Sequence, residues 1–375
     1  MTDLSIAHAA PPPAPFPWFG GKSKVAAPIW ERLGPVSNYV EPFFGSGAVL
    51  LQRPQPFTGP ETINDADGFV ANAWRAIARD PEATAAHADW PVNEVDLHAR
   101  HAWLVTQRGD LTTRLMGDPE YFDAKIAGWW LWGICAWIGG GWCSGNGPWQ
   151  SSDGRLVDTR LQAAGTAGQG IERRRPHLSA GQGINRKRPH LGNAGQGINR
   201  QLPHLGDAGN GINRKLPPLG NAGRGAFIAD WFTALSVRLR DVRVCCGDWT
   251  RVMGNSVTIK HAGITGVLLD PPYADSAGRC GDLYAVDSQQ VAHAVREWAL
   301  AHGDDPRLRI ALCGYEGEHA MPATWSVLAW KTQGGYGNLS DKAGRANAAR
   351  ERIWFSPHCL SGRNRQIGFG LESAA

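Results

Sequence analysis

The sequence predicts an α/β fold with a doubly wound, mainly parallel sheet that a large inserted region interrupts. Strand-length apolar runs alternate with helical patterns near both ends of the chain, and this alternation is typical of a parallel sheet covered by helices. An early run leads into a glycine turn at residues 45–47. The stretch between the two alternating parts is rich in Gly, Trp and repeats and lacks the alternation.

The first alternating part predicts two strands, each followed by a helix. Residues 38–44 form an apolar, aromatic run that ends at the glycine turn, and a helix starts at Ala48. Residues 62–64 lead as a second strand into Asp65, and residues 69–77 have apolar positions at helical spacing.

The last part of the chain resumes the alternation. Its predicted strands are 242–246, 266–269, 309–313, 325–330 and 352–355, and its predicted helices are 230–239 and 289–300.

Composition is that of a folded cytoplasmic protein. Of 375 residues 42% are hydrophobic and 19% are charged. Residues 1–15, with their proline run, are expected to be a flexible lead-in without the apolar segment of a signal peptide. The seven cysteines form no CxxC pair, so we expect reduced thiols and no zinc site or disulfide framework.

Residues 126–143 are uncharged and tryptophan-rich, which raises the question of a membrane helix. Five of these eighteen residues are glycines, and no basic cluster flanks the segment. Glycines weaken a helix, and basic flanks normally fix its orientation in a membrane. We therefore expect a buried packing segment, whose tryptophans could alternatively stack on bases.

A 14-residue unit recurs in the insert, with near-copies that begin at Gly168, Gly181, Gly195 and Gly209 and a truncated copy at Gly223. Residues 168–224 hold ten Arg/Lys and two acids, a net charge of +8, while the whole chain carries +4. The units are too short and too polar to build a core. They are either a low-complexity insertion or a basic arm for nucleic-acid phosphates. Their histidines, His177, His190 and His204, lack acidic neighbours, so no metal is expected.

Three sequence elements predict a site for an adenosine-type cofactor. The segment Trp18–Lys22 contains a glycine pair and a lysine beside a helix start, which suits a carboxylate or phosphate. At Gly45-Ser46-Gly47 a strand runs into a turn where only glycine leaves room for a cofactor. Asp65 follows Gly45 by twenty residues, the position of a carboxylate that accepts ribose hydroxyls.

The tetrapeptide Asp270-Pro271-Pro272-Tyr273 ends an apolar strand and predicts the catalytic chemistry. Its prolines stiffen the turn and expose carbonyl acceptors. A carboxylate and a carbonyl that accept both hydrogens of an exocyclic amine would make that nitrogen nucleophilic, and Tyr273 offers a flat face to an extruded base.

The order of W-F-G-G-K, E-P-F-F-G-S-G, N-D and D-P-P-Y resembles the Dam-like adenine-N6 DNA methyltransferases, particularly those of phages and prophages. The resemblance covers about 1–80 and 227–375. It implies a Rossmann-like methyltransferase sheet formed by residues 16–80 and 226–375. Residues 81–225, with the repeats 168–224, would be the inserted DNA-recognition region.

By this resemblance the cofactor is S-adenosyl-L-methionine, with no metal, and the partner is double-stranded DNA in a bacterial host cell, in a phage or restriction–modification setting. A monomer is compatible with it. Trp18 and Lys22 would hold the methionine end, Phe43, Gly45, Ser46 and Gly47 the pocket, Asp65 the ribose and Asp248 the adenine. Asp270, Pro271, Pro272 and Tyr273 would serve the target amine, with Asp270 also facing the cofactor. Arg345, Arg350 and Arg352 either meet phosphates or form a solvated face.

Three other functions fit part of the pattern. N4-cytosine methylation uses the same amine chemistry, although an acid before the two prolines leans toward adenine. A non-catalytic nucleic-acid-binding protein could keep a degenerate methyltransferase body, but intact Gly45, Gly47 and Asp65 argue against it. An NAD-dependent oxidoreductase would share the glycine loop and leave Asp270–Tyr273 without a purpose.

Overall fold

The structure is a computed structural model. It describes residues 11–18, 20–137, 142–143, 149–152, 155–158, 225–260, 263–272, 290–330 and 350–361. The repeats, most of the lead-in, Tyr273 and Arg345 therefore lie outside the described residues.

Seven strands form the main sheet, in the order β5-β2-β1-β6-β7-β9-β8. Their bounds are β1 Asn38–Glu41, β2 Glu61–Asp65, β5 Val242–Cys246, β6 Thr265–Leu269, β7 Leu308–Tyr315, β8 Ser326–Ala329 and β9 Glu351–Phe355. The first five in this order pair in parallel, and β9 runs antiparallel to both β7 and β8. The predicted mainly parallel α/β sheet is confirmed, with an antiparallel hairpin at one edge.

Alternating side chains of these strands enter separate hydrophobic cores on the two faces of the sheet. On β7, Ala311 and Cys313 belong to one core, while Ile310 and Leu312 belong to the other. Because successive residues of a strand point to opposite faces, both faces must be covered. The sheet is therefore doubly wound, as predicted.

The helices are α1 Ala26–Leu33, α2 Ala48–Leu51, α3 Gly68–Arg79, α4 Pro81–Ala88, α5 Glu94–Gly117, α6 Ala124–Ala136, α9 Gly225–Leu239, α10 Asn255–Thr258 and α11 Val291–His302, with a 3-10 turn η3 Trp249–Val252. A short hairpin joins β3 Trp149–Ser152 and β4 Arg155–Asp158. Side-chain caps start several helices: Asp67 accepts from the amide of Phe69 at 2.9 Å, and Asp123 accepts from that of Ile126 at 2.8 Å.

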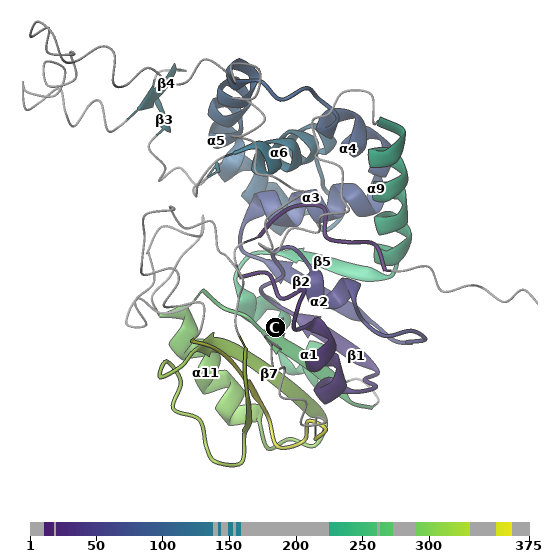
Figure 1. Ribbon diagram of the computed structural model, residues 1–375, viewed down its shortest axis with the longest axis vertical. Coiled ribbons are helices and arrows are strands. Elements are labelled where there is room, and N and C mark those ends of the chain that lie inside the picture. Colours follow the sequence, from purple (N-terminus) through teal and green to yellow (C-terminus); the bar gives the residue numbers. More distant parts are fainter. Residues whose placement is uncertain are drawn as a thin grey trace, which may run out of the picture.

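Helices α3 to α6 and α9 gather beyond the β5 end of the sheet, and α11 lies at the other end (Figure 1). Gly128 of α6 lets α4 approach closely, since a Cβ there would lie 2.7 Å from the carbonyl oxygen of Thr84. Trp130 and Trp132 of α6 are buried, which confirms the predicted packing segment. Within the described residues no helix has the length and apolar character needed to cross a membrane.

Two predicted elements differ from the observed ones by three residues or more at one end. The strand expected over 38–44 ends at Glu41, because Pro42 has no N–H for a ladder bond and the chain then turns. The amide of Phe44 instead donates to the carbonyl of Asn64 at 3.0 Å. Helix α9 begins at Gly225, earlier than the predicted residue 230.

Candidate active site

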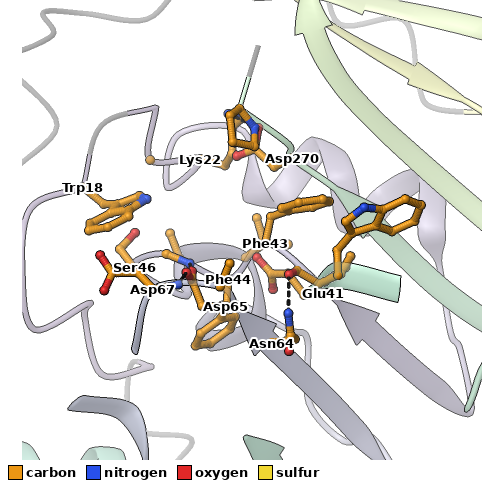
Figure 2. A pocket seen from close by; sticks show the side chains of 18 of the residues that line it. Trp18, Lys22, Glu41, Phe43, Phe44, Ser46, Asn64, Asp65, Asp67 and Asp270 are labelled. Carbon is orange, nitrogen blue, oxygen red and sulfur yellow. Dashed lines mark hydrogen bonds and ion pairs between the residues drawn. The ribbon is translucent and has the colours of Figure 1, made fainter. Parts of the chain in front are cut away.

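A cavity opens at the carboxyl ends of four neighbouring parallel strands, β5, β2, β1 and β6. Strand β1 lies between β2 and β6, and the chain passes from β1 to β2 on one side before it returns to form β6 on the other side. Such a switch in strand order creates the crevice where open α/β sheets bind ligands. Figure 2 shows Lys22 and Asp270 on one side of this cavity and Asp65 on the opposite side, with Trp18 and Phe43 at its flanks.

The turn after β1 approaches the cavity with its backbone, as the glycine pattern predicts. Gly45 and Gly47 have φ values of 48° and 66°, a region that disfavours residues with a Cβ. A Cβ on Gly45 would lie 2.4 Å from Nε1 of Trp18, and one on Gly47 would lie 2.5 Å from the ring of Phe44. The turn is also fixed from below, because Nε1 of Trp74 donates to the carbonyl of Gly45 at 2.8 Å.

Asp65, at the end of β2, faces this turn. Its carboxylate accepts hydrogen bonds from the amides of Gly45 and Asp67, each at 2.9 Å. Burial raises the pKa of Asp65 from 3.8 to about 7, helped by the nearby charge of Asp67 and opposed by the two amides. Each carboxylate oxygen keeps a further lone pair, so Asp65 can still accept from a diol in the cavity.

Asp248 and Trp249 border the cavity from the turn after β5. The Oδ1 atom of Asp248 accepts from both the amide and the hydroxyl of Thr250, which starts η3. Phe43 and Trp249 stack, with ring centroids 6.1 Å apart and an interplanar angle of 29°. This arrangement offers apolar surface for a flat heterocycle and leaves Oδ2 of Asp248 for a hydrogen-bond donor on it.

Lys22 and Asp270 are the closest charged pair of the cavity. The ammonium of Lys22 donates to both carboxylate oxygens of Asp270 at 2.8 Å, and to the carbonyl of Gly20 at 2.8 Å. Burial alone would lower the pKa of Lys22, but the charges of Asp270, Cys313 and Glu351 and the hydrogen bond to Asp270 together outweigh it and hold that pKa above its usual range. The bond joins residues 248 positions apart, so the start of the chain orients the predicted catalytic carboxylate.

Sequence reasoning missed several residues that shape the cavity. Glu41 is buried at the end of β1 and accepts from the hydroxyl of Tyr39 at 2.9 Å; burial raises its pKa well above the usual range. The amide of Asn64 donates to the carbonyls of Pro42 and Gly247 at 3.1 and 2.9 Å. Trp249 directly follows the predicted Asp248, and its aromatic side chain is the one sequence signal that could have placed it in the cavity.

The structure brings most of the predicted site residues to one cavity: Trp18, Lys22, Phe43, Gly45, Ser46, Gly47, Asp65, Asp248, Asp270 and Pro272 all line it. Pro271 is buried behind them, and Tyr273 lies outside the described residues. Elsewhere, Arg352 forms an ion pair with Glu316 at 2.7 Å. Among the described residues no group of three or more His, Cys, Asp or Glu side chains is arranged to hold a metal ion.

The sheet, with its antiparallel edge hairpin and the cofactor turn after β1, has the fold of S-adenosylmethionine-dependent methyltransferases. Residues 18–95 match the family model described as D12 class N6 adenine-specific DNA methyltransferase. The match covers about a fifth of the chain, including the glycine turn and Asp65, and it indicates methylation of adenine N6 in DNA with S-adenosylmethionine as the methyl donor. No curated protein matches the chain.

Proposed function

We propose that this chain methylates N6 of an adenine flipped out of duplex DNA, and that Asp270, Pro271, Pro272 and Tyr273 hold the amine. The observation that carries the proposal is the position of Asp270, at the end of the strand beside the glycine turn and with its carboxylate fixed by Lys22. The same site residues would serve N4-cytosine methylation, but the matched family is adenine-specific.

The cavity suits the methyl donor. Gly45 and Gly47 leave a cradle that a Cβ would fill, Asp65 can accept from ribose hydroxyls, and Asp248 with Trp249 and Phe43 can hold the adenine ring. Trp18 covers the turn and would contact the methionine end. When bound, S-adenosylmethionine supplies a methyl group on a positively charged sulfur.

On the other side of the cavity, Asp270 would accept one hydrogen of the target amine and the Pro271 carbonyl the other. These two acceptors increase electron density on nitrogen as it attacks the methyl carbon, and they place it in line with that carbon. The Asp270 carboxylate then lies where it can take up the proton that nitrogen loses. Lys22 holds the carboxylate in place through a hydrogen bond to each of its oxygens.

Asp270→Asn tests the proposal. This change keeps the size of the side chain but removes the charge, so we expect methylation to fall at least about a hundredfold while S-adenosylmethionine binding stays within a few fold. Labelled methyl transfer to unmodified DNA measures the first quantity, and calorimetric titration with the cofactor measures the second.

Asp304→Asn is the matched control. Asp304 is an exposed acid next to the amino end of β7, on the opposite edge of the sheet, so this variant should methylate normally. Full activity of Asp270→Asn would contradict the mechanism. Digestion of the product to nucleosides distinguishes N6-methyladenine from N4-methylcytosine.

We also propose that residues 81–225 form the DNA-recognition region and that residues 16–80 and 226–375 form the catalytic domain. Support comes from the packing of α4 and α5 on α6 beyond the β5 end of the sheet. It comes also from the net charge of +8 in the repeats of that region.

A further inference from the structure

A second pocket lies on the helical part of the molecule, away from the cofactor cavity. It is formed by α4, α5, the start of α6 and the turn that holds Trp90. Its lining combines three tryptophans with two cations and one acid, and the residues that matter below are Trp90, Trp103, Trp129, Arg100, Lys125 and Asp96.

Arg100 is the unusual member of this pocket. Its side chain is buried, with 8% exposed, and Nη1 has no hydrogen-bond partner in the part of the chain that the structure describes. The guanidinium instead lies over three indole rings, 5.2 Å from the centroid of Trp90, 4.9 Å from that of Trp129 and 4.3 Å from that of Trp132. A buried cation without an anionic partner is costly, so the pocket calls for an anion.

The acid at the rim does not meet this need. Asp96 is half-buried, and its Oδ2 accepts from Nε1 of Trp90 at 2.7 Å and from the side-chain amide of Asn93 at 2.6 Å. The charge of Asp96 acts on Arg100, but no salt bridge joins the two side chains and Nη1 stays without an acceptor. The carboxylate therefore braces the pocket wall and compensates the charge of the guanidinium only in part.

Lys125 adds a second cation at the same place. Its ammonium lies 4.5 Å from the ring centroids of both Trp103 and Trp129, so both cations of the pocket lie close to Trp129. Lys125 is exposed, and apolar indole rings lie beside its ammonium. An anion near two cations and apolar walls is bound more strongly than an anion near one cation on an open surface.

We propose that this pocket binds one backbone phosphate of the DNA substrate, with Arg100 and Lys125 as its ligands; the inference rests on the proposed function. The planar guanidinium matches phosphate oxygens, and the indole of Trp90, 46% exposed at the rim, offers a flat face to the adjoining deoxyribose.

The path of α5 agrees with a single duplex that reaches both sites. This helix begins at the pocket and ends beside the cofactor cavity, where Nη2 of Arg251 donates to the carbonyl of Met116 at 3.3 Å. At 1.5 Å per residue, Arg100 and Met116 are about 24 Å apart along the helix axis. That distance corresponds to about seven base pairs of duplex.

The test is the salt dependence of DNA binding by the full chain, measured by fluorescence anisotropy with a labelled 30-base-pair duplex between about 50 and 200 mM NaCl. Each phosphate contact contributes about 0.9 to the slope of log Kd against log salt. We expect the Arg100→Gln, Lys125→Gln double variant to lose about 0.9 of this slope. Each single variant should lose part of it, because both residues bind one phosphate.

Lys260→Gln is the matched control, since Lys260 is an exposed lysine after α10, near the amino end of β1; its slope should equal that of the parent. Lys125→Gln alters only an exposed side chain, so it keeps the test valid if Arg100→Gln fails to fold. An unchanged slope in Lys125→Gln and in a folded double variant would overturn the proposal. Binding of poly-L-glutamate by the same variants is a second measurement. If the variants lose this binding but keep the DNA slope of the parent, the proposal is also overturned and the pocket is assigned to an acidic peptide.

The two proposals can fail separately. Calorimetric titration with S-adenosylmethionine and labelled methyl transfer are measured on the same preparations. If the parent protein fails to methylate DNA while the double variant still has a lower salt slope than the parent, the proposed function is contradicted and the phosphate site is supported. If the parent protein methylates DNA while Lys125→Gln keeps the full salt slope, only the phosphate site is contradicted.

Discussion

At the scale of single residues, Asp65 stands out because its charge changes near neutral pH. Its pKa is raised from 3.8 to about 7, chiefly by burial. Between these values the folded protein binds a proton that the unfolded chain has released. The contribution of Asp65 to stability is therefore fully present below about pH 4 and is lost as the pH rises through about 7.

Cofactor affinity should follow the opposite course. The ionised carboxylate is the better acceptor for two ribose hydroxyls, so S-adenosylmethionine should bind more tightly as the pH rises from 6 to 8. The expected gain is up to about tenfold per pH unit below the pKa. Titration calorimetry over this range measures it, with Asp65→Asn as the comparison. The proposed ribose contact would be wrong if both proteins showed the same pH profile.

Gly45 allows a second residue-scale prediction. In Gly45→Ala the new methyl group would have to displace the indole of Trp18 and adopt a positive φ. We expect cofactor affinity to fall at least tenfold, together with a loss of stability of about 1 kcal/mol. Gly109→Ala on α5 is the control, because the added Cβ would have no neighbouring atom within 4 Å. This variant should leave cofactor affinity unchanged. Equal affinities of the two variants would show that the turn has room to spare.

At the scale of elements, Asn64 links two turns that carry proposed cofactor-binding residues. Asn64→Ala leaves the carbonyls of Pro42 and Gly247 without their donor, so we expect a loss of about 1–3 kcal/mol in unfolding free energy and weaker cofactor binding. Asn38 provides the comparison: its amide donates to Val257 and Thr265 at the amino end of β1. Asn38→Ala should cost similar stability in thermal unfolding yet keep cofactor affinity. If Asn64→Ala also kept that affinity, the link would be structural only.

Elements were more predictable than the contacts between them. Strands such as 242–246 and 266–269 are apolar runs of the right length, and the sequence alone gives them within a residue of β5 and β6. Asp270 follows from the end of its strand, and Asp248 follows from the family resemblance. The pairing of Lys22 with Asp270 does not, because it depends on how segments 248 residues apart meet in space. Arg100 has no local sequence signal either, since its three indole neighbours come from two separate segments of the chain.

At the scale of the whole molecule, charge distribution carries the remaining prediction. The repeats hold a net charge of +8 in residues 168–224, which leaves the rest of the chain with a net charge of −4, since the whole carries +4. Deletion of residues 168–223 should flatten the salt dependence of DNA binding, because fewer counterions are released. Cofactor affinity should be spared.

Anisotropy titrations at several salt concentrations check this expectation, and the deletion protein must still bind S-adenosylmethionine for the comparison to count. A slope equal to that of the full chain would favour the other interpretation of the repeats, a low-complexity insertion without a role in binding.

The parallel pairing of β1 with β6 also has a consequence during synthesis. Asn38 and Thr265, which begin this pair, are 227 residues apart, and a ribosome adds about 5–20 residues per second. For roughly 10 to 45 seconds after it emerges, β1 therefore has no partner on that side. An unpaired apolar edge attracts other strands, so the nascent chain is most exposed to aggregation in this interval. Any message cut short before the codon for Thr265 yields a protein that lacks both the central strand pair and the proposed catalytic acid Asp270.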